Sequence, residues 1–489
     1  MLRSLVALVS LAASAAAQPP TDELDRQMRS ILGAYAIAEQ NAADPITAAQ
    51  AFYRGAIPGL LRTLDPHSVF FDPDQFEQLR KMESSTQKGF GSVVSLMPGR
   101  VIVLQSLPGT PSAKGGLAAG DEILAVNGYI VARLDLEQLT ELLGASRQGV
   151  ARLDVRRPGE SRIMQVTLTP EEMQTDSVDR AFFVGPGMGY IRVAGFDEKT
   201  PQQLKAAIER LGGARLKGLV LDLRGNPGGL LTAAVQTASL FLRPGLEIVT
   251  VRGRNVPEKT DSVPSLATPY ACKLAILIDG KSASASEIFS GAMQDHDRAT
   301  IVGETSFGKG LVQSVFPLSE STGLALTTAL YYTPSGRSIQ KPLDASRFEL
   351  GGATAHPNAI SEFRTDSGRK VAGGGGIQPD VAAHPALMNR LRTVLEASGS
   401  FPDFAAQYLR THKVTLDFEV LPELMDQFRV FLVERRISPS LGEWSMEREF
   451  IESRLQEEIF TLAFGVEQGD EIGAKRDPVV LKPVEELGS

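Results

Sequence analysis

The chain has 489 residues, too many for one compact core, so two to four domains are expected. Its 43% hydrophobic and 22% charged residues are typical of a soluble globular protein, and a net charge of −8 gives no electrostatic reason to bind nucleic acid. The one cysteine, Cys272, excludes an internal disulfide and a cysteine-based zinc site. We therefore expect protein or peptide substrates and a chemistry that needs no metal or organic cofactor.

The first residues have the pattern of a secretory signal peptide. Arg3 precedes an apolar run at 5–15, and the small residues Ala15 and Ala17 follow it, which predicts cleavage after residue 17. A retained membrane anchor is the alternative, but the run is shorter than the roughly 20 residues that a spanning helix needs. We predict an exported chain that is soluble in the periplasm or outside the cell once residues 1–17 are removed.

Residues 22–87 carry apolar side chains at helical spacing, among them Leu24 and Met28. The sequence Asp-Pro-His-Ser at 65–68 interrupts this spacing with a turn. The prediction is a helical N-terminal region, which would pack on the core or take part in a homodimer.

Residues 88–170 change to short strand-like runs punctuated by glycine, for example at 100–104 and 151–155. The stretch from Gly120 to Gly128 is an apolar strand that ends in an Asn-Gly pair, a strong signal for a tight hairpin turn. Over about 80 residues this pattern resembles a PDZ domain.

The PDZ resemblance implies a binding loop for a peptide C-terminus. Gly89, Phe90, Gly91 and Ser92 would turn main-chain N–H groups toward the terminal carboxylate, while the peptide adds a strand to the sheet edge. Glycine allows the close approach and unusual dihedral angles that such a loop needs. The alternative is a small β domain that binds no peptide.

Residues 180–385 alternate apolar strands with helices, as expected of a layered α/β core whose sites lie at the strand ends. Strands are predicted at 218–223 and 274–278, and a helix at 230–242. Residues 386–489 are helical and charged, and we predict a packing or oligomer element without chemistry, with frayed last residues near Pro478, Pro483 and Gly488.

Three serines separated by alanines follow the 274–278 strand, at 282, 284 and 286, just before residues at helical spacing. A serine at such a junction can expose its hydroxyl while the first N–H groups of the helix face an oxyanion. A serine nucleophile needs a base. His296 is the histidine nearest in sequence, but Lys309, between two glycines in an apolar stretch, is the better candidate if burial keeps its amine uncharged.

Residues 280–313 closely resemble the active-site region of the C-terminal processing peptidases, also called tail-specific proteases. The resemblance implies that Ser284 is the nucleophile, that Lys309 is the base, and that Gln313 orients the lysine. Four residues of a straight strand span about 13 Å, so the glycines beside Lys309 must bend the chain for Gln313 to reach it. Asp295 is a supporting residue in some members, with a purely structural role as the alternative.

Further family motifs occur in the expected order at 65–68, 226–229, 332–340 and 376–380. The loop at 226–229 implies an oxyanion hole made by Gly228 or Gly229 together with Ala285. The implied fold is multidomain α+β: a crotonase-like α/β peptidase core, an inserted PDZ-like β domain, and helical N- and C-terminal regions.

These motifs imply a serine endopeptidase that cleaves C-terminal regions of proteins and recognises substrate tails through the PDZ-like domain. Its substrates would have accessible C-termini. The sequence leaves open whether an adaptor or activator protein takes part. One alternative is an inactive scaffold of the same fold. Another is the Ser-x-x-Lys chemistry of penicillin-binding proteins, whose spacing occurs at Ser306 with Lys309 and at Ser85 with Lys88, but whose other motifs are missing.

Overall fold

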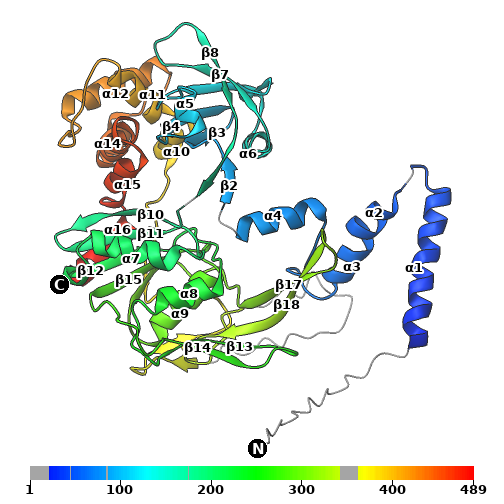
Figure 1. The fold of residues 1–489 in the computed structure, drawn as a ribbon. Coiled ribbons are helices and arrows are strands. Elements are labelled where there is room, and N and C mark those ends of the chain that lie inside the picture. The colour runs from blue at the N-terminus through cyan, green and yellow to red at the C-terminus, as the bar shows by residue number, and fades with distance from the viewer. Residues whose placement is uncertain (1–20, 45, 84–85, 175, 342–361, 489) are drawn as a thin grey trace, which may run out of the picture. The chain divides into compact units, whose positions relative to one another are not determined.

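The computed structural model describes residues 21–488 except 45, 84–85, 175 and 342–361 (Figure 1). The predicted signal peptide and Ser85 therefore lie outside the described residues. The chain divides into two compact units. Unit 1 contains the described residues up to Phe76 together with Gln313–Thr327, and unit 2 contains Glu77–Val312 and the chain from Thr328 onward.

Unit 1 is helical at its N-terminal end, as predicted. Its helices are α1 (Thr21–Asn41), α2 (Ala48–Ala51) and α3 (Ile57–Arg62), with a π-helical turn at Phe52–Ala56. The predicted turn at 65–68 is present, because Asp65 Oδ1 accepts the N–H groups of His67 (2.7 Å) and Ser68 (2.8 Å). Strand β1 (Val69–Phe71) then pairs antiparallel with the first residues of β18 (Gly323–Tyr332).

The first part of unit 2 is the PDZ-like domain, which α4 (Pro73–Glu83) precedes. Its sheet has the order β3 (Ser92–Met97), β4 (Arg100–Ser106), β5 (Glu122–Val126), β7 (Ala151–Arg156), β8 (Ile163–Leu168), with β6 (Tyr129–Ile130) paired to β5. Strands β2 (Thr86–Gly89) and β9 (Glu171–Gln174) pair at its base, and helices α5 (Pro111–Lys114) and α6 (Leu136–Ser146) complete it. The predicted Asn-Gly turn is confirmed: Asn127 (φ 50°) and Gly128 (φ 84°) join β5 to β6.

The second sheet of unit 2 forms the predicted α/β core. Its order is β10 (Val178–Gly185), β11 (Met188–Val193), β12 (Gly218–Asp222), β15 (Lys273–Ile278), β16 (Thr300–Gly303), β21 (Val381–Ala382). All neighbours are parallel except β10 and β11. The helices α7 (Thr200–Arg210), α8 (Leu231–Ala238) and α9 (Ala285–Asp295) accompany it. The strands predicted at 218–223 and 274–278 are confirmed, whereas the helix predicted at 230–242 ends at Ala238.

Successive residues of the core strands point to opposite faces of this sheet. Leu219 and Leu221 of β12 join the apolar cluster that includes α8 and α9, whereas Val220 between them packs with Val479 and Val480. Those two valines belong to α16 (Pro478–Gly488) and are buried. The prediction of frayed last residues is therefore wrong. A mainly parallel sheet needs both faces covered, and α16 covers the second one.

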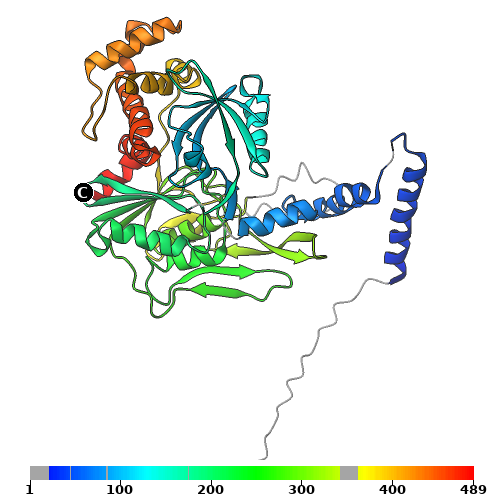
Figure 2. The ribbon, with the colours of Figure 1, turned by 45° about the horizontal axis from the view of Figure 1, so that its top comes forward.

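The C-terminal helical domain comprises α10 (Arg390–Ala397), α11 (Ser400–Leu409), α12 (Pro422–Glu434), α13 (Leu441–Met446), α14 (Arg448–Phe464) and α15 (Val466–Ala474). It has its own aromatic core, and it lies beside the PDZ-like domain, with Arg100 of β4 bonded to Asp403 of α11 at 2.8 Å (Figure 2). The remaining strands are β13 (Glu247–Arg252), β14 (Lys259–Ser262), β17 (Leu311–Pro317), β19 (Glu362–Arg364) and β20 (Lys370–Ala372). Among the described residues, no helix combines the length and the apolar character needed to cross a membrane.

Candidate active site

The three serines after β15 have different environments, and only the middle one is accessible. Ser282 and Ser286 are fully buried, and their hydroxyls donate to Leu223 O (2.7 Å) and Asn226 O (3.1 Å). Ser284 is partly exposed and stands at the N-cap of α9 with φ 54° and ψ −114°. A non-glycine residue rarely adopts this conformation, and such strain is concentrated at functional sites. The structure therefore singles out Ser284 as the hydroxyl that can meet a substrate.

Two main-chain N–H groups beside Ser284 are suited to bind an oxyanion. Among the described residues, no acceptor is found for the N–H of Ala285 or of Gly229, whereas the Gly228 N–H donates to Asn226 Oδ1 at 2.8 Å. A Cβ atom on Gly228 (φ 101°) would lie 2.8 Å from Ala285 N and 2.8 Å from Ser284 Cβ. The Gly228 main chain thus lies so close to the segment of the nucleophile and the Ala285 N–H that only glycine fits there.

The carboxyl group of Glu287 joins the serine segment to the lysine segment. Glu287 is 1% exposed, and its Oε2 accepts the main-chain N–H groups of Ser284 and Lys309, both at 2.9 Å. Its Oε1 accepts the Ser306 hydroxyl (2.6 Å) and the Gly308 N–H (2.7 Å). Burial raises the pKa of this carboxyl, and these hydrogen bonds oppose the rise. Since all four neighbours donate, the arrangement suits the ionised form.

Tyr331 makes a second connection between the same two segments. This side chain is 1% exposed, and its hydroxyl lies 3.1 Å from Ser284 O and also contacts Lys309 O. Burial, followed by the nearby Glu287 charge, holds the pKa of Tyr331 well above its usual value, so the hydroxyl stays a donor. Lys309 itself is partly buried and lies just before β17. Ser284 and Lys309, predicted from the sequence as nucleophile and base, are therefore brought together at their main chains.

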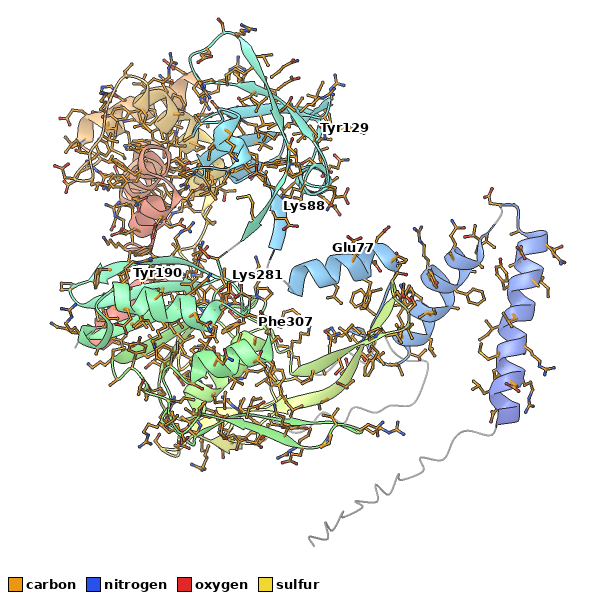
Figure 3. All side chains as sticks on the ribbon, viewed as in Figure 1. Glu77, Lys88, Tyr129, Tyr190, Lys281 and Phe307 are labelled. Atoms are coloured by element: carbon orange, nitrogen blue, oxygen red, sulfur yellow. The ribbon has the colours of Figure 1, made fainter. Side chains whose placement is uncertain are left out.

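The environment of Ser306 argues against the Ser-x-x-Lys alternative. Its hydroxyl is buried, donates to Glu287 Oε1 and accepts the Ile377 N–H at 2.6 Å, so it cannot readily approach a substrate. Lys281 and Phe307, which Figure 3 labels, are among the exposed residues of this region. Among the two candidate serines of the described chain, only Ser284 is open to a peptide.

Asp295 belongs to a buried ion pair at the other end of α9. Its Oδ1 lies 2.7 Å from Arg337 Nη2, and its Oδ2 accepts the Ser335 N–H at 3.0 Å. Both charged side chains are almost fully buried, and burial lowers the pKa of the Arg337 guanidinium while Asp295 opposes the change. These contacts fasten the turn at 333–337 to α9, and they favour the structural role for Asp295 over a catalytic one.

Gln313 is part of unit 1, whereas Ser284 and Lys309 are part of unit 2. Within unit 1 its Nε2 donates to His67 O at 2.6 Å, so the turn at 65–68 fixes the orientation of the amide. Through this contact the predicted N-terminal motif at 65–68 holds the Gln313 side chain in place.

The predicted peptide-binding loop lies beside an edge strand of the PDZ-like domain. Gly89 ends β2, Phe90 packs against the domain core, and Ser92 begins β3, which is the terminal strand of its sheet. Gly91 has φ 74°, and a Cβ there would meet Thr110 Cβ at 2.2 Å, so this position requires glycine. The predicted loop therefore leads directly into the edge strand β3.

Glu287 and Tyr331 are not among the residues that the sequence motifs predicted for the site. The spacing of Ser284 and Glu287 is itself a signal, because Ser-x-x-Glu before an apolar helix is a capping box in which the glutamate returns to the N-cap N–H. No sequence signal points to Tyr331, since its contacts join residues that are distant in the chain.

Comparisons with known proteins identify the family of the chain. The sequence matches Peptidase family S41 over residues 187–344 and the PDZ domain over residues 102–157. The carboxy-terminal-processing protease of Bartonella bacilliformis is 38% identical over 305 residues, which are 60% of this chain and 68% of the relative. The carboxy-terminal processing protease CtpB of Bacillus subtilis is 30% identical over 322 residues, which are 65% and 67% of the two chains. The carboxyl-terminal-processing protease of a Synechocystis species is 33% identical over 292 residues, 58% and 68% of the two chains.

Together these matches define the class of protein as a serine peptidase that carries a PDZ domain. Within that class, the chain belongs to peptidase family S41, the carboxyl-terminal-processing proteases. The resemblance drawn from the motifs is thereby confirmed, as is the multidomain α+β fold with a PDZ β domain and helical regions.

Proposed function

We propose that the protein cleaves the C-terminal regions of protein substrates with Ser284 as nucleophile and Lys309 as general base. One observation carries the proposal: a single oxygen of Glu287 accepts the N–H groups of both residues at 2.9 Å. The two nitrogens are thus at most twice that distance apart, a gap that the four-carbon stem of lysine can cover. A lysine amine can therefore reach the Ser284 hydroxyl from this backbone arrangement.

In the proposed mechanism, uncharged Lys309 takes the hydroxyl proton as the Ser284 oxygen attacks the scissile carbonyl carbon. The resulting oxyanion accepts N–H bonds from Ala285 and Gly229, the two donors for which the described residues offer no other acceptor. The ammonium of Lys309 then protonates the leaving amine, and water hydrolyses the acyl-enzyme with the lysine again as base. The resemblance to the family implies that Gln313 completes this catalytic centre, and within unit 1 its amide is oriented by His67 O.

Substrate tails are proposed to bind first at the PDZ-like domain. The support is the position of β3 as the terminal strand of its sheet, next to the glycine loop at 89–92, because a peptide can be added to such an edge as an extra strand. For the peptidase core we propose a crotonase-like arrangement of layers, which the mainly parallel sheet and the helices beside it support. Amidation of a substrate C-terminus should weaken cleavage, since it removes the carboxylate that the loop would bind.

Substitution at the two catalytic positions tests the mechanism. Ser284→Ala and Lys309→Ala should each abolish cleavage of a protein with an apolar C-terminus and leave the melting temperature unchanged. Lys281→Ala is the matched control, because Lys281 is an exposed lysine three residues from the nucleophile, and it should keep wild-type activity. Wild-type cleavage by Lys309→Ala would reject the assigned base, and cleavage by Ser284→Ala would reject the nucleophile. Peptide binding without any cleavage by the wild-type chain would favour the inactive scaffold.

Export to the periplasm or the outside of the cell is a separate proposal, supported by the signal-like pattern of residues 1–17. N-terminal sequencing of the protein recovered from periplasmic and culture fractions tests it. A mature chain that begins at Gln18 is expected, and recovery of an uncleaved chain from the cytoplasm would contradict it.

A further inference from the structure

We infer that Glu287 is a positioning residue of the peptidase, whose carboxylate sets the distance between the nucleophile and the base. The inference rests on the proposed roles of Ser284 and Lys309. Glu287 is on the first turn of α9, so it is fixed to the helix that begins at the nucleophile. Its hydrogen bonds to residues 306, 308 and 309 reach a loop that is about 20 residues further along the chain.

Each carboxylate oxygen of Glu287 accepts a different pair of hydrogen bonds. Oε2 holds the N–H groups of Ser284 and Lys309, and Oε1 holds the Ser306 hydroxyl and the Gly308 N–H. A carboxylate accepts at both oxygens, which is what four donors require. Glutamine has one acceptor and one NH₂ group, so in either orientation its nitrogen would face two donors and lose their bonds.

The four hydrogen bonds of Glu287 do more than satisfy buried polar groups. The Ser306 hydroxyl and the Gly308 N–H fasten the loop, but the Oε2 bonds act on the main chains of the two residues that exchange a proton. A displacement of about 1 Å between reacting groups can cost about 100-fold in rate. The carboxylate therefore acts on the chemical step and has little effect on the binding of a substrate tail.

Two substitutions and a matched control test the inference. Glu287→Gln keeps size and one acceptor, and kcat should fall about 10-fold; Glu287→Leu removes both acceptors at similar volume, and kcat should fall about 100-fold or more. KM should change less than about twofold in both variants, because the effect is on the reacting groups. Glu458→Gln is the control: Glu458 is also a buried helical glutamate, but it lies in α14 of the C-terminal helical domain, and its kcat should stay at the wild-type value.

The measurements are kcat and KM on one protein substrate, with melting temperatures for all variants and with Ser284→Ala as the inactive reference. If Glu287→Leu does not fold, the kcat and KM of Glu287→Gln alone test the inference. A fall in kcat of less than about fivefold in Glu287→Gln, or a loss that appears only in KM, overturns the inference. Activity in Ser284→Ala would instead reject the proposed mechanism, so the two failures are distinguishable.

Discussion

The substitution Gly228→Ala tests whether the space in front of Ser284 is an oxyanion hole. The added methyl group would lie 2.7 Å from Ala283 O and 2.8 Å from both Ala285 N and Ser284 Cβ. None of these atoms is the movable end of a long side chain, so the loop that carries Gly228 and the Gly229 N–H would have to move away from the Ala285 N–H, and the two oxyanion donors would separate.

Two free-energy terms follow from this geometry. Loss of an oxyanion-hole donor typically lowers kcat by about 10²–10³, or roughly 3–4 kcal/mol of transition-state stabilisation. Alanine at φ 101° also costs about 1–2 kcal/mol of stability. We therefore expect kcat to fall at least about 100-fold while the protein stays folded with a modestly lower melting temperature.

Gly225→Ala is the matched control, because it lies in the same loop, has φ 71°, and has no atom within 4 Å of an added Cβ. It should show the strain of about 1–2 kcal/mol without the loss of kcat. The assay is steady-state cleavage of a protein substrate together with thermal unfolding of both variants. A kcat within threefold of wild type in Gly228→Ala would refute the assignment of the hole. An equal loss in Gly225→Ala would show that loop strain, and not the displacement of the oxyanion donors, lowers the rate.

Two further predictions concern stability. Burial raises the pKa of Glu458 to about 7, with the charges of Glu457 and Glu396 adding to the rise and Arg454 opposing it. The folded state therefore binds this proton more tightly than the unfolded state, and the free energy of unfolding should decrease as the pH rises from about 4.5 to 7. Glu458→Gln should remove this slope, so its melting temperature should exceed that of wild type at pH 8 but not at pH 4.5; an equal difference at both values would contradict the assignment. Val480→Ala should cost about 2 kcal/mol in thermal unfolding because Val480 of α16 is fully buried, whereas Val433→Ala, at a site 54% exposed, should cost less than about 0.5 kcal/mol. Equal effects would mean that α16 does not cover the sheet.

Local sequence chemistry was enough to predict the core strands and the hairpin turn. Apolar runs at 218–223 and 274–278 became β12 and β15, and the Asn-Gly pair at 127–128 adopted the positive φ angles that its turn requires. Their conformations depend mainly on neighbouring residues, so a single sequence contains the relevant information.

The C-terminal end could not be predicted in the same way. Pro478, Pro483 and Gly488 look like helix breakers, but Pro478 is the first residue of α16, where a missing N–H costs nothing. Asp477 caps the helix through Val479 N at 2.9 Å. The need to cover the second face of the sheet then outweighs the unfavourable Pro483, and such a need depends on tertiary structure.

The candidate site also has one part that the local sequence predicts and another that depends on tertiary structure. The motifs identified Ser284 and Lys309, but they could not show that an acidic side chain of α9 would accept hydrogen bonds from a loop 19 to 22 residues away. A glutamate near a helix N-terminus is usually read as a solvated capping residue. Only the burial of Glu287 to 1% exposure separates the two interpretations.

The buried polar side chains around Ser284 share one property: each bonds the main chain of a different segment. They are Asn226 to Val193 O, Ser282 to Leu223 O, Ser286 to Asn226 O and Glu287 to Lys309 N. Burying such groups costs desolvation, and apolar residues of similar volume often stabilise a core at least as well. Stability alone therefore does not explain this concentration of polar groups under one strained serine. Their common effect is to fix the backbone of the loops that carry the nucleophile, the base and the oxyanion donors, which is what a reaction with narrow distance requirements needs.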